Sequence, residues 1–296
     1  HTTQTVGLAL ANDLAAETSR PKVVGLMYVM LLLGMMVSAV LFGYLLQDFT
    51  PGKLIQVIQG CAVATLVLNV VALWKQESRS RNRRGKPEVE PSFNEAWQTL
   101  TLDPRAKRSL VAIGLGTMAF TMEDVLLEPY GGEILKLSVS STTLLTATLA
   151  LGGLIGFGWA SRVISRGADP YRMASWGAWI GLPAFVLIIF AAPLMSVYMF
   201  VLGVFLIGLG GGLFAHGTLT ASMNLAPPDQ TGLAMGAWGA VQATASGLGM
   251  ALGGLLRDGV AQLSDSVTGY SAVYGIEVVI LILTLMAMKP LLRKSN

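Results

Sequence analysis

Charged residues are scarce in this sequence, and their scarcity decides the class of protein. Only 12% of the residues are Asp, Glu, Lys or Arg, against 53% hydrophobic residues, whereas a soluble domain carries about 25% charged residues. Long runs have no charge at all: 23–47, 54–74, 137–161, 173–228 and 231–256. Each run can cross about 30 Å of hydrocarbon, and 173–228 can cross twice. The sequence therefore predicts an all-α polytopic membrane protein.

Cysteine and histidine are also rare. The single cysteine, Cys61, excludes an internal disulfide framework and a thiolate metal site, and we expect it to be a small core residue. The two histidines are His1 and His216. No Walker loop, metal-binding helix motif or nucleophile–base pair is visible. We therefore expect neither an enzyme nor a partner made of nucleic acid.

The basic residues predict the topology. The expected spans are 1–12 (partial), 23–46, 54–74, 109–128, 140–161, 173–193, 197–223, 232–256 and 271–288. With these spans, 17 of the 20 Lys and Arg residues fall on one side of the membrane. That side is cytoplasmic by the positive-inside rule, and it includes the 75–108 segment and the C-terminus.

The segment 75–108 is the only long polar stretch, which predicts a linker between two helical bundles. Its basic residues would also attract anionic lipid, by about 1 kcal/mol for each residue near the surface. The expected organisation is 1–74 as the remainder of an N-terminal half, 75–108 as a cytoplasmic basic linker, and 109–296 as a C-terminal six-helix half.

The two histidines stand in similar contexts, which indicates an internal repeat. His1-Thr-Thr-Gln-Thr precedes Asn12, and His216-Gly-Thr-Leu-Thr precedes Asn224. Parallel duplication of a six-helix unit leaves this pattern. If His216 lies in the fourth helix of the second half, the chain would lack the first three helices and part of the fourth of the first half.

Acidic residues within an apolar segment mark a candidate site. Glu123, Asp124 and Glu128 follow an uncharged stretch, and Pro129, Gly131 and Gly132 come directly after them, where we expect the helix to break. A carboxylate at membrane depth costs about 2.5–3.5 kcal/mol on insertion scales, so such residues are functional candidates.

Asp124 and Glu128 are four residues apart and would share a helix face. They could form a proton or cation coupling site or bind a pigment carbonyl. Alternatively, the helix ends near Glu123 and the acids lie in the outer interface. We expect Glu123 to point elsewhere, toward solvent, and we expect Tyr130 and Glu277 at the membrane interface.

Glycines recur four residues apart in the segments 203–217 and 232–254. The pairs are Gly208/Gly212, Gly232/Gly236 and Gly249/Gly253. Small residues at this spacing allow membrane helices to approach closely. The alternative is a groove for a flat macrocycle or an isoprenoid tail.

Three motifs in order carry a resemblance to a known family: Leu-Leu-Glu-Pro-Tyr-Gly-Gly at 126–132, a glycine-rich segment with His216 at 210–220, and Gly-Leu-Ala-Met-Gly-Ala-Trp at 232–238. The chain resembles the PucC/LhaA family of light-harvesting complex assembly factors, which are similar to the major facilitator superfamily. The resemblance implies a twelve-helix bundle in two halves, seen here from about the fourth helix onward.

The family resemblance also implies a function in the bacterial inner, intracytoplasmic photosynthetic membrane. The protein would bind bacteriochlorophyll or deliver it to the light-harvesting α and β polypeptides. A reaction centre–antenna complex and membrane lipids are further expected partners, and a carotenoid or isoprenoid lipid is a further expected ligand. Other hypotheses are an ion-coupled small-molecule transporter of the major facilitator type and a structural subunit of a pigment–protein complex.

Pigment binding would need an axial ligand for magnesium. A neutral imidazole can serve as one, which makes His216 the main candidate and His1 a second. Gln242 is a polar exception in its span and a weaker candidate. The alternatives are a hydrogen bond of His216 across a helix interface and an interhelical hydrogen bond of Gln242.

Overall fold

The computed structural model describes residues 7, 20–74, 102–225 and 231–292, and all the regular structure in these residues is helical. The helices are α2 (Arg20–Leu45), α3 (Pro51–Leu73), α5 (Pro104–Thr121), η2 (Glu123–Val125), α6 (Leu127–Glu133), α7 (Val139–Ile164), α8 (Pro170–Ala191), α9 (Val197–Leu225), α10 (Thr231–Leu263) and α11 (Ser266–Met288). Seven spans among them are long and apolar enough to cross a membrane, with α5 to α6 as one span. The chain is therefore a multi-pass membrane protein, as predicted.

Helix boundaries follow from local capping chemistry. Asp103 and Asp169 each accept a hydrogen bond from the backbone N–H two residues later, at 2.8 and 2.9 Å, and each precedes a proline. An acidic N-cap followed by proline at the first helical position is a strong start signal. As a result α5 begins at Pro104, inside the segment predicted to be linker. The rest of that predicted linker, 75–101, lies outside the described residues, as do His1 and all of the partial span 1–12 except Gly7.

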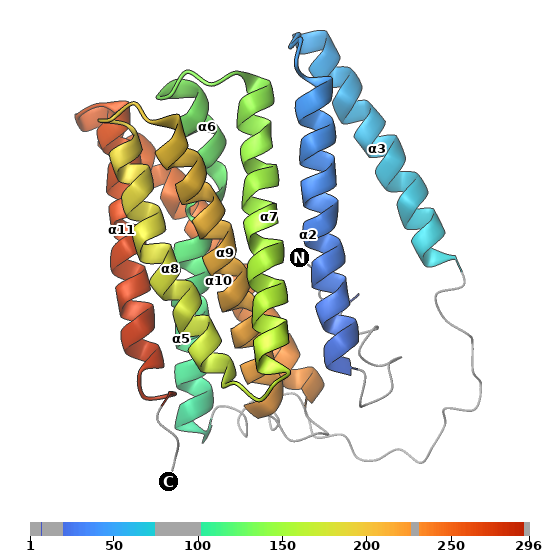
Figure 1. Cartoon of the computed structure of the whole chain (residues 1–296), viewed down its shortest axis with the longest axis vertical. Helices are drawn as coiled ribbons and strands as arrows, with labels where there is room; N and C mark the ends of the chain where they lie inside the picture. Colours follow the sequence, from blue (N-terminus) through green and yellow to red (C-terminus); the bar gives the residue numbers. More distant parts are fainter. Residues whose placement is uncertain (1–6, 8–19, 75–101, 226–230, 293–296) are drawn as a thin grey trace.

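The described helices form one bundle with an attached pair (Figure 1). α9 packs against α7 and α8, while α11 packs against α5 and α8, and α10 packs against α5 and α11. α2 lies along the outer side of α7, and α3 stands at the edge with no buried residue.

Two of the three predicted glycine pairs mediate close helix contacts. A Cβ at Gly208 or Gly212 would collide with backbone carbonyl oxygens of α7, and one at Gly253 would lie 2.6 Å from the carbonyl oxygen of Met122, the C-cap of α5. At Gly236, in contrast, nothing lies within 4 Å, so the prediction of close packing is wrong there. Because neighbouring backbone fills the space beside the α9 pair, these two glycines form no groove for a macrocycle.

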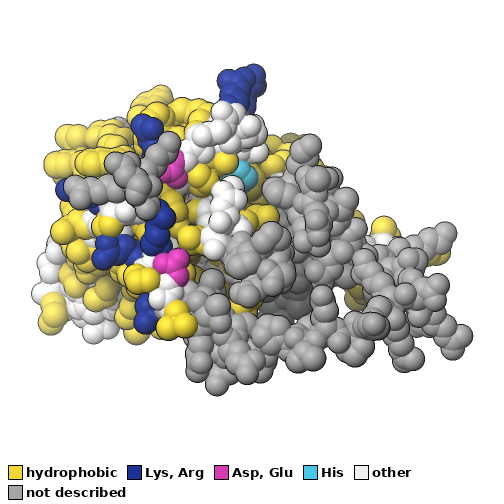
Figure 2. Space-filling view, turned by 90° about the horizontal axis from the view of Figure 1, so that it is seen from below, with side chains coloured by type: hydrophobic (Ala, Val, Ile, Leu, Met, Phe, Trp, Pro, Cys, Tyr) yellow, Lys and Arg dark blue, Asp and Glu magenta, His cyan; other side chains and the backbone are white. Residues whose placement is uncertain are grey.

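Basic residues gather at one end of the bundle, where α5, α8 and α10 begin (Figure 2). The described helices alternate in direction in the predicted order (Figure 1). The opposite end carries Lys53 in the first turn of α3, Lys136 just after α6, and Arg257 in the last two turns of α10. The two ends therefore differ in charge as the predicted topology requires.

Candidate functional site

The helix that carries the acidic residues breaks earlier than the sequence predicted. α5 ends at Thr121, the short 3-10 helix η2 covers Glu123–Val125, and α6 starts at Leu127. Pro129, Gly131 and Gly132, the predicted break, lie inside α6, so that prediction is wrong. Pro129 is the third residue of α6, in the first turn, where a backbone N–H has no intrahelical partner and proline is tolerated.

The break turns Glu123 into the bundle. Its side chain is 0% exposed, and neither carboxylate oxygen has a hydrogen-bond partner among the described residues. The expectation that Glu123 points to solvent is therefore wrong. An unbroken helix would have given Glu123 a different direction, and the helical periodicity of the sequence contained no sign of the 3-10 turn.

A second acid from α11 lies in the same region. Glu277 was expected at the membrane interface, but it is 0% exposed, and both of its carboxylate oxygens lack a described partner. The hydroxyl of Tyr274, one turn earlier on α11, is also buried without a partner. The two carboxyls and the Tyr274 hydroxyl interact electrostatically. The buried acidic site is therefore built from Glu123, Glu277 and Tyr274.

Asp124 and Glu128, the predicted pair, are both exposed. Glu128 Oε1 accepts a 2.7 Å hydrogen bond from the Thr146 hydroxyl of α7. These two acids form no buried site, and the end of α5 at Thr121 agrees with the alternative in which the helix ends near Glu123.

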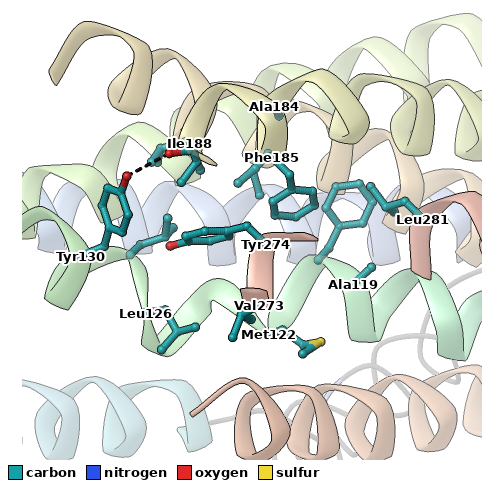
Figure 3. Close-up of a cluster of buried hydrophobic side chains, with 14 of the residues drawn as sticks. Ala119, Met122, Leu126, Tyr130, Ala184, Phe185, Ile188, Val273, Tyr274 and Leu281 are labelled. Carbon is teal, nitrogen blue, oxygen red and sulfur yellow. Dashed lines mark hydrogen bonds between the residues drawn. The ribbon is translucent and has the colours of Figure 1, made fainter. Parts of the chain in front are cut away.

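Aromatic rings pack around Tyr274 (Figure 3). Tyr130 of α6 is 0% exposed, and its hydroxyl donates a 2.9 Å hydrogen bond to the Ile188 carbonyl oxygen, so its predicted interfacial position is wrong. Its ring centroid lies 5.8 Å from that of Tyr274, which stacks in turn on Phe185 at 6.4 Å. Such pairs stabilise beyond the area they bury, by about 0.5–1.5 kcal/mol each.

The one described ion-pair network lies toward the end opposite the basic one. Arg257 of α10 forms ion pairs with Glu133 and Asp258. Tyr270 of α11 donates a 3.0 Å hydrogen bond to Glu133, and the guanidinium carbon lies 4.6 Å from the Tyr270 ring centroid. The network joins α6, α10 and α11, and the charge of Arg257 is paired with Glu133 and Asp258.

His216 lies in a separate aromatic group, which contains residues of α2, α7, α9 and α10. The imidazole is 8% exposed, and its ring centroid lies 4.3 Å from that of Phe157 in an edge-on arrangement. Phe157 stacks on Tyr28 at 5.6 Å, and Tyr28 packs edge-on against Trp238 at 6.0 Å.

The imidazole of His216 makes no side-chain hydrogen bond within the described part of the chain, and Nδ1 is buried without a partner. The hydrogen bond across a helix interface, which was the alternative role, is therefore absent. Trp238 takes that role instead, since its Nε1 donates to the Thr218 hydroxyl at 3.3 Å.

The other two predicted pigment ligands are Gln242 and His1. Gln242 of α10 is half-buried and makes no hydrogen bond with the described residues, so its predicted interhelical bond is not found. His1 lies outside the described residues. No group of three His, Cys, Asp or Glu among the residues described could hold a metal ion.

These features define a helical membrane protein of the major facilitator architecture. Two solved transporters share the fold: a bacterial homologue of the human lysosomal transporter Spinster, with a TM-score of 0.61 and 16% identity over 92% of this chain and 71% of that one, and the Escherichia coli fucose:proton symporter, with a TM-score of 0.62 and 15% identity over 96% of this chain and 73% of that one.

The chain belongs to the family described as PUCC protein, whose profile matches residues 1–296. It is 61% identical to Protein PucC of Rhodovulum sulfidophilum over 88% of this chain, and 52% identical to Protein PucC of Cereibacter sphaeroides over its whole length. It is also 24% identical, over 94% of its length and 66% of the relative's, to the protein named bacteriochlorophyll synthase 44.5 kDa chain of Rhodobacter capsulatus. The chain spans 58% and 65% of the lengths of the two PucC relatives.

Proposed function

We propose that this chain belongs to a membrane factor that assembles bacterial light-harvesting antennae and binds bacteriochlorophyll through His216. Membership of the PUCC family over the whole chain carries the assembly role. A more distant relative whose name refers to bacteriochlorophyll supports the choice of pigment. The factor would have no catalytic role, and its partners would be the antenna α and β polypeptides and a reaction centre–antenna complex.

The surroundings of His216 support its role as a ligand. A neutral imidazole can bind the magnesium of a chlorophyll, provided that the imidazole is not already engaged in other bonds. Within the described residues His216 has no side-chain hydrogen bond, and its Nδ1 is sealed from solvent. The other ring nitrogen, Nε2, is then the ligand atom, and Phe157 and Tyr28 would provide aromatic surface for the edge of the macrocycle.

The orientation that we propose follows from the charge, and the membrane that we propose follows from the family. We place the basic end of the bundle, the 75–108 segment and the C-terminus in the cytoplasm, with the helices in the inner, intracytoplasmic photosynthetic membrane. A carotenoid or an isoprenoid lipid is a further ligand consistent with this environment.

The absorption spectrum of the purified full-length protein tests the pigment proposal. We expect bound bacteriochlorophyll, with lower occupancy or a shifted absorption band in His216→Ala, because magnesium loses its axial nitrogen. His216→Gln should restore part of the occupancy through its amide oxygen. Tyr198→Phe serves as the control, since Tyr198 is exposed near the start of α9 and lies outside the aromatic group.

Unchanged occupancy and an unchanged band in His216→Ala would contradict the proposal. In that case water, a backbone carbonyl or another residue would ligate the magnesium, and His216 would serve only in packing between α7 and α9.

The unpartnered acids Glu123 and Glu277 favour a second candidate, an ion-coupled transporter of a small molecule. Uptake into proteoliposomes that depends on a proton gradient would support it. Co-purified pigment with no such uptake would favour the assembly role.

A further inference from the structure

Neither pigment binding nor the packing of the bundle explains the buried acids Glu123 and Glu277. Both side chains are 0% exposed, and all four carboxylate oxygens lack a hydrogen-bond partner among the residues described. They come from two different elements, η2 and α11. The hydroxyl of Tyr274, which interacts electrostatically with both, is equally buried and unpartnered. Three buried polar groups in one place, all unsatisfied, indicate a site that takes something up.

No described cation compensates the two acids. α11 contains no Lys or Arg, and Arg257 of α10 is bound to Glu133 and Asp258. The basic residues of α5 and α8 lie near the starts of those helices; Arg108, the last one in α5, lies about 22 Å before Glu123 along a helix at 1.5 Å per residue.

The remaining ionisable groups around the pair are acids and tyrosines. Asp124 of η2 adds negative charge to both carboxyls. Tyr130 packs on Tyr274, Tyr270 packs on Tyr130, and neither carries a positive charge. The site therefore has surplus negative charge and no built-in counter-charge.

The chemistry of such a site selects its occupant. An ionised carboxylate without a partner in an apolar interior is strongly disfavoured, and two neighbouring ones also repel each other. A proton removes one charge and turns one carboxyl into a hydrogen-bond donor for the other groups. A metal ion would need more oxygen ligands than the pair supplies, and no group of three His, Cys, Asp or Glu surrounds it in the described structure.

We infer that Glu123 and Glu277 form a proton-binding site, with the Tyr274 hydroxyl as the neighbouring polar group. The proton passes from hydronium to a carboxylate oxygen: one O–H bond of hydronium breaks, one O–H bond of the carboxyl forms, and water remains. The site is closed in the described packing, so the proton enters or leaves when α11 moves away from the break in α5. The break acts as the hinge for this movement, because η2 separates α5 from α6. Proton uptake is thereby linked to the movement of α11, whether or not pigment binds at His216.

Infrared spectroscopy of the full-length protein in lipid nanodiscs tests this inference. At neutral pH we expect the C=O stretching band of a protonated, slowly exchanging carboxyl. The band should shift in Glu123→Gln and in Glu277→Gln, because one buried carboxyl remains protonated in each, and it should be lost in the double variant. It should remain in the control Glu128→Gln, since Glu128 is exposed and hydrogen-bonded to Thr146. Tyr274→Phe should shift the band, because it removes a hydroxyl that interacts electrostatically with both carboxyls.

Absence of the band in the unaltered protein would overturn the inference, and that measurement needs no variant to fold. Persistence of the band in the double variant would also overturn it. So would a band that Na⁺ or K⁺ abolishes at constant pH, because the site would then bind a metal cation. His216→Ala should leave the band unchanged, so failure of the pigment proposal and failure of the proton site give different results.

Discussion

At the scale of single residues, burial and partners decided the role of each polar side chain. Glu123 and Asp124 are adjacent in the chain, yet one is 0% exposed and the other is exposed. Sequence reasoning recognised that acids at this depth are unusual, but it selected Asp124 and Glu128 by helical spacing. The selection failed because η2 rotates the chain between them. The predicted interfacial positions of Tyr130 and Glu277 were wrong for a related reason. An aromatic or acidic residue near a predicted span end is buried when another helix covers it.

Asp265 gives a pH-dependent prediction at this scale. It caps α11 outside the membrane-spanning segments, and the hydrogen bonds from Thr268 lower the pKa of its carboxyl below the ordinary value of 3.8. A lowered pKa in the folded state means that this cap stabilises fully above pH 3.8 and is lost as the pH falls through the folded-state pKa.

Thermal unfolding of detergent-solubilised protein measures this contribution. The unaltered protein should exceed Asp265→Ala in unfolding temperature at neutral pH, and the difference should shrink under strongly acidic conditions. A difference that stays constant over the whole acidic range would show that the carboxylate charge contributes nothing to the cap. Gln262→Ala provides a neighbouring control, since Gln262 is exposed and makes none of the hydrogen bonds to Asp265.

At the scale of helices, glycine spacing correctly indicated close contacts where two helices cross. Whether a given glycine contacts a neighbouring helix depends on the fold and not on the four-residue spacing. Gly208 faces the backbone of α7, whereas Gly236 faces open space, although both stand in the same four-residue pattern.

These two glycines form a matched pair for mutagenesis. Gly208→Ala should destabilise the bundle by about 1–3 kcal/mol, because its Cβ meets the Leu149 carbonyl oxygen and α7 and α9 must separate. Gly236→Ala should be neutral or stabilising, since alanine favours the helix by roughly 1 kcal/mol and meets no neighbour. Unfolding temperatures in detergent compare them, and equal losses in both variants would contradict the assigned contact.

At the scale of the whole molecule, the charge difference between the two ends predicts the orientation. Arg166 lies at the basic end, after α7, and Ser264 lies at the opposite end, between α10 and α11. With Cys61→Ser as the background, a membrane-impermeant thiol reagent should label Ser264→Cys in intact cells. It should label Arg166→Cys only after the cells are opened. The reverse labelling would invert the topology.

The sequence by itself determined the membrane class, most span positions, the charge difference between the ends and the family. These properties depend on composition, on runs of about 20 apolar residues and on contiguous motifs, all of which are local. Only the tertiary structure decided that Glu123 and Glu277 lie in the same buried region, because five described helices separate η2 from α11 along the chain. The direction of Glu123 also depends on a 3-10 turn. It likewise decided that His216 packs on Phe157 while Trp238 forms the hydrogen bond. Long-range packing determines burial and partners, and periodicity within one helix contains no information about it.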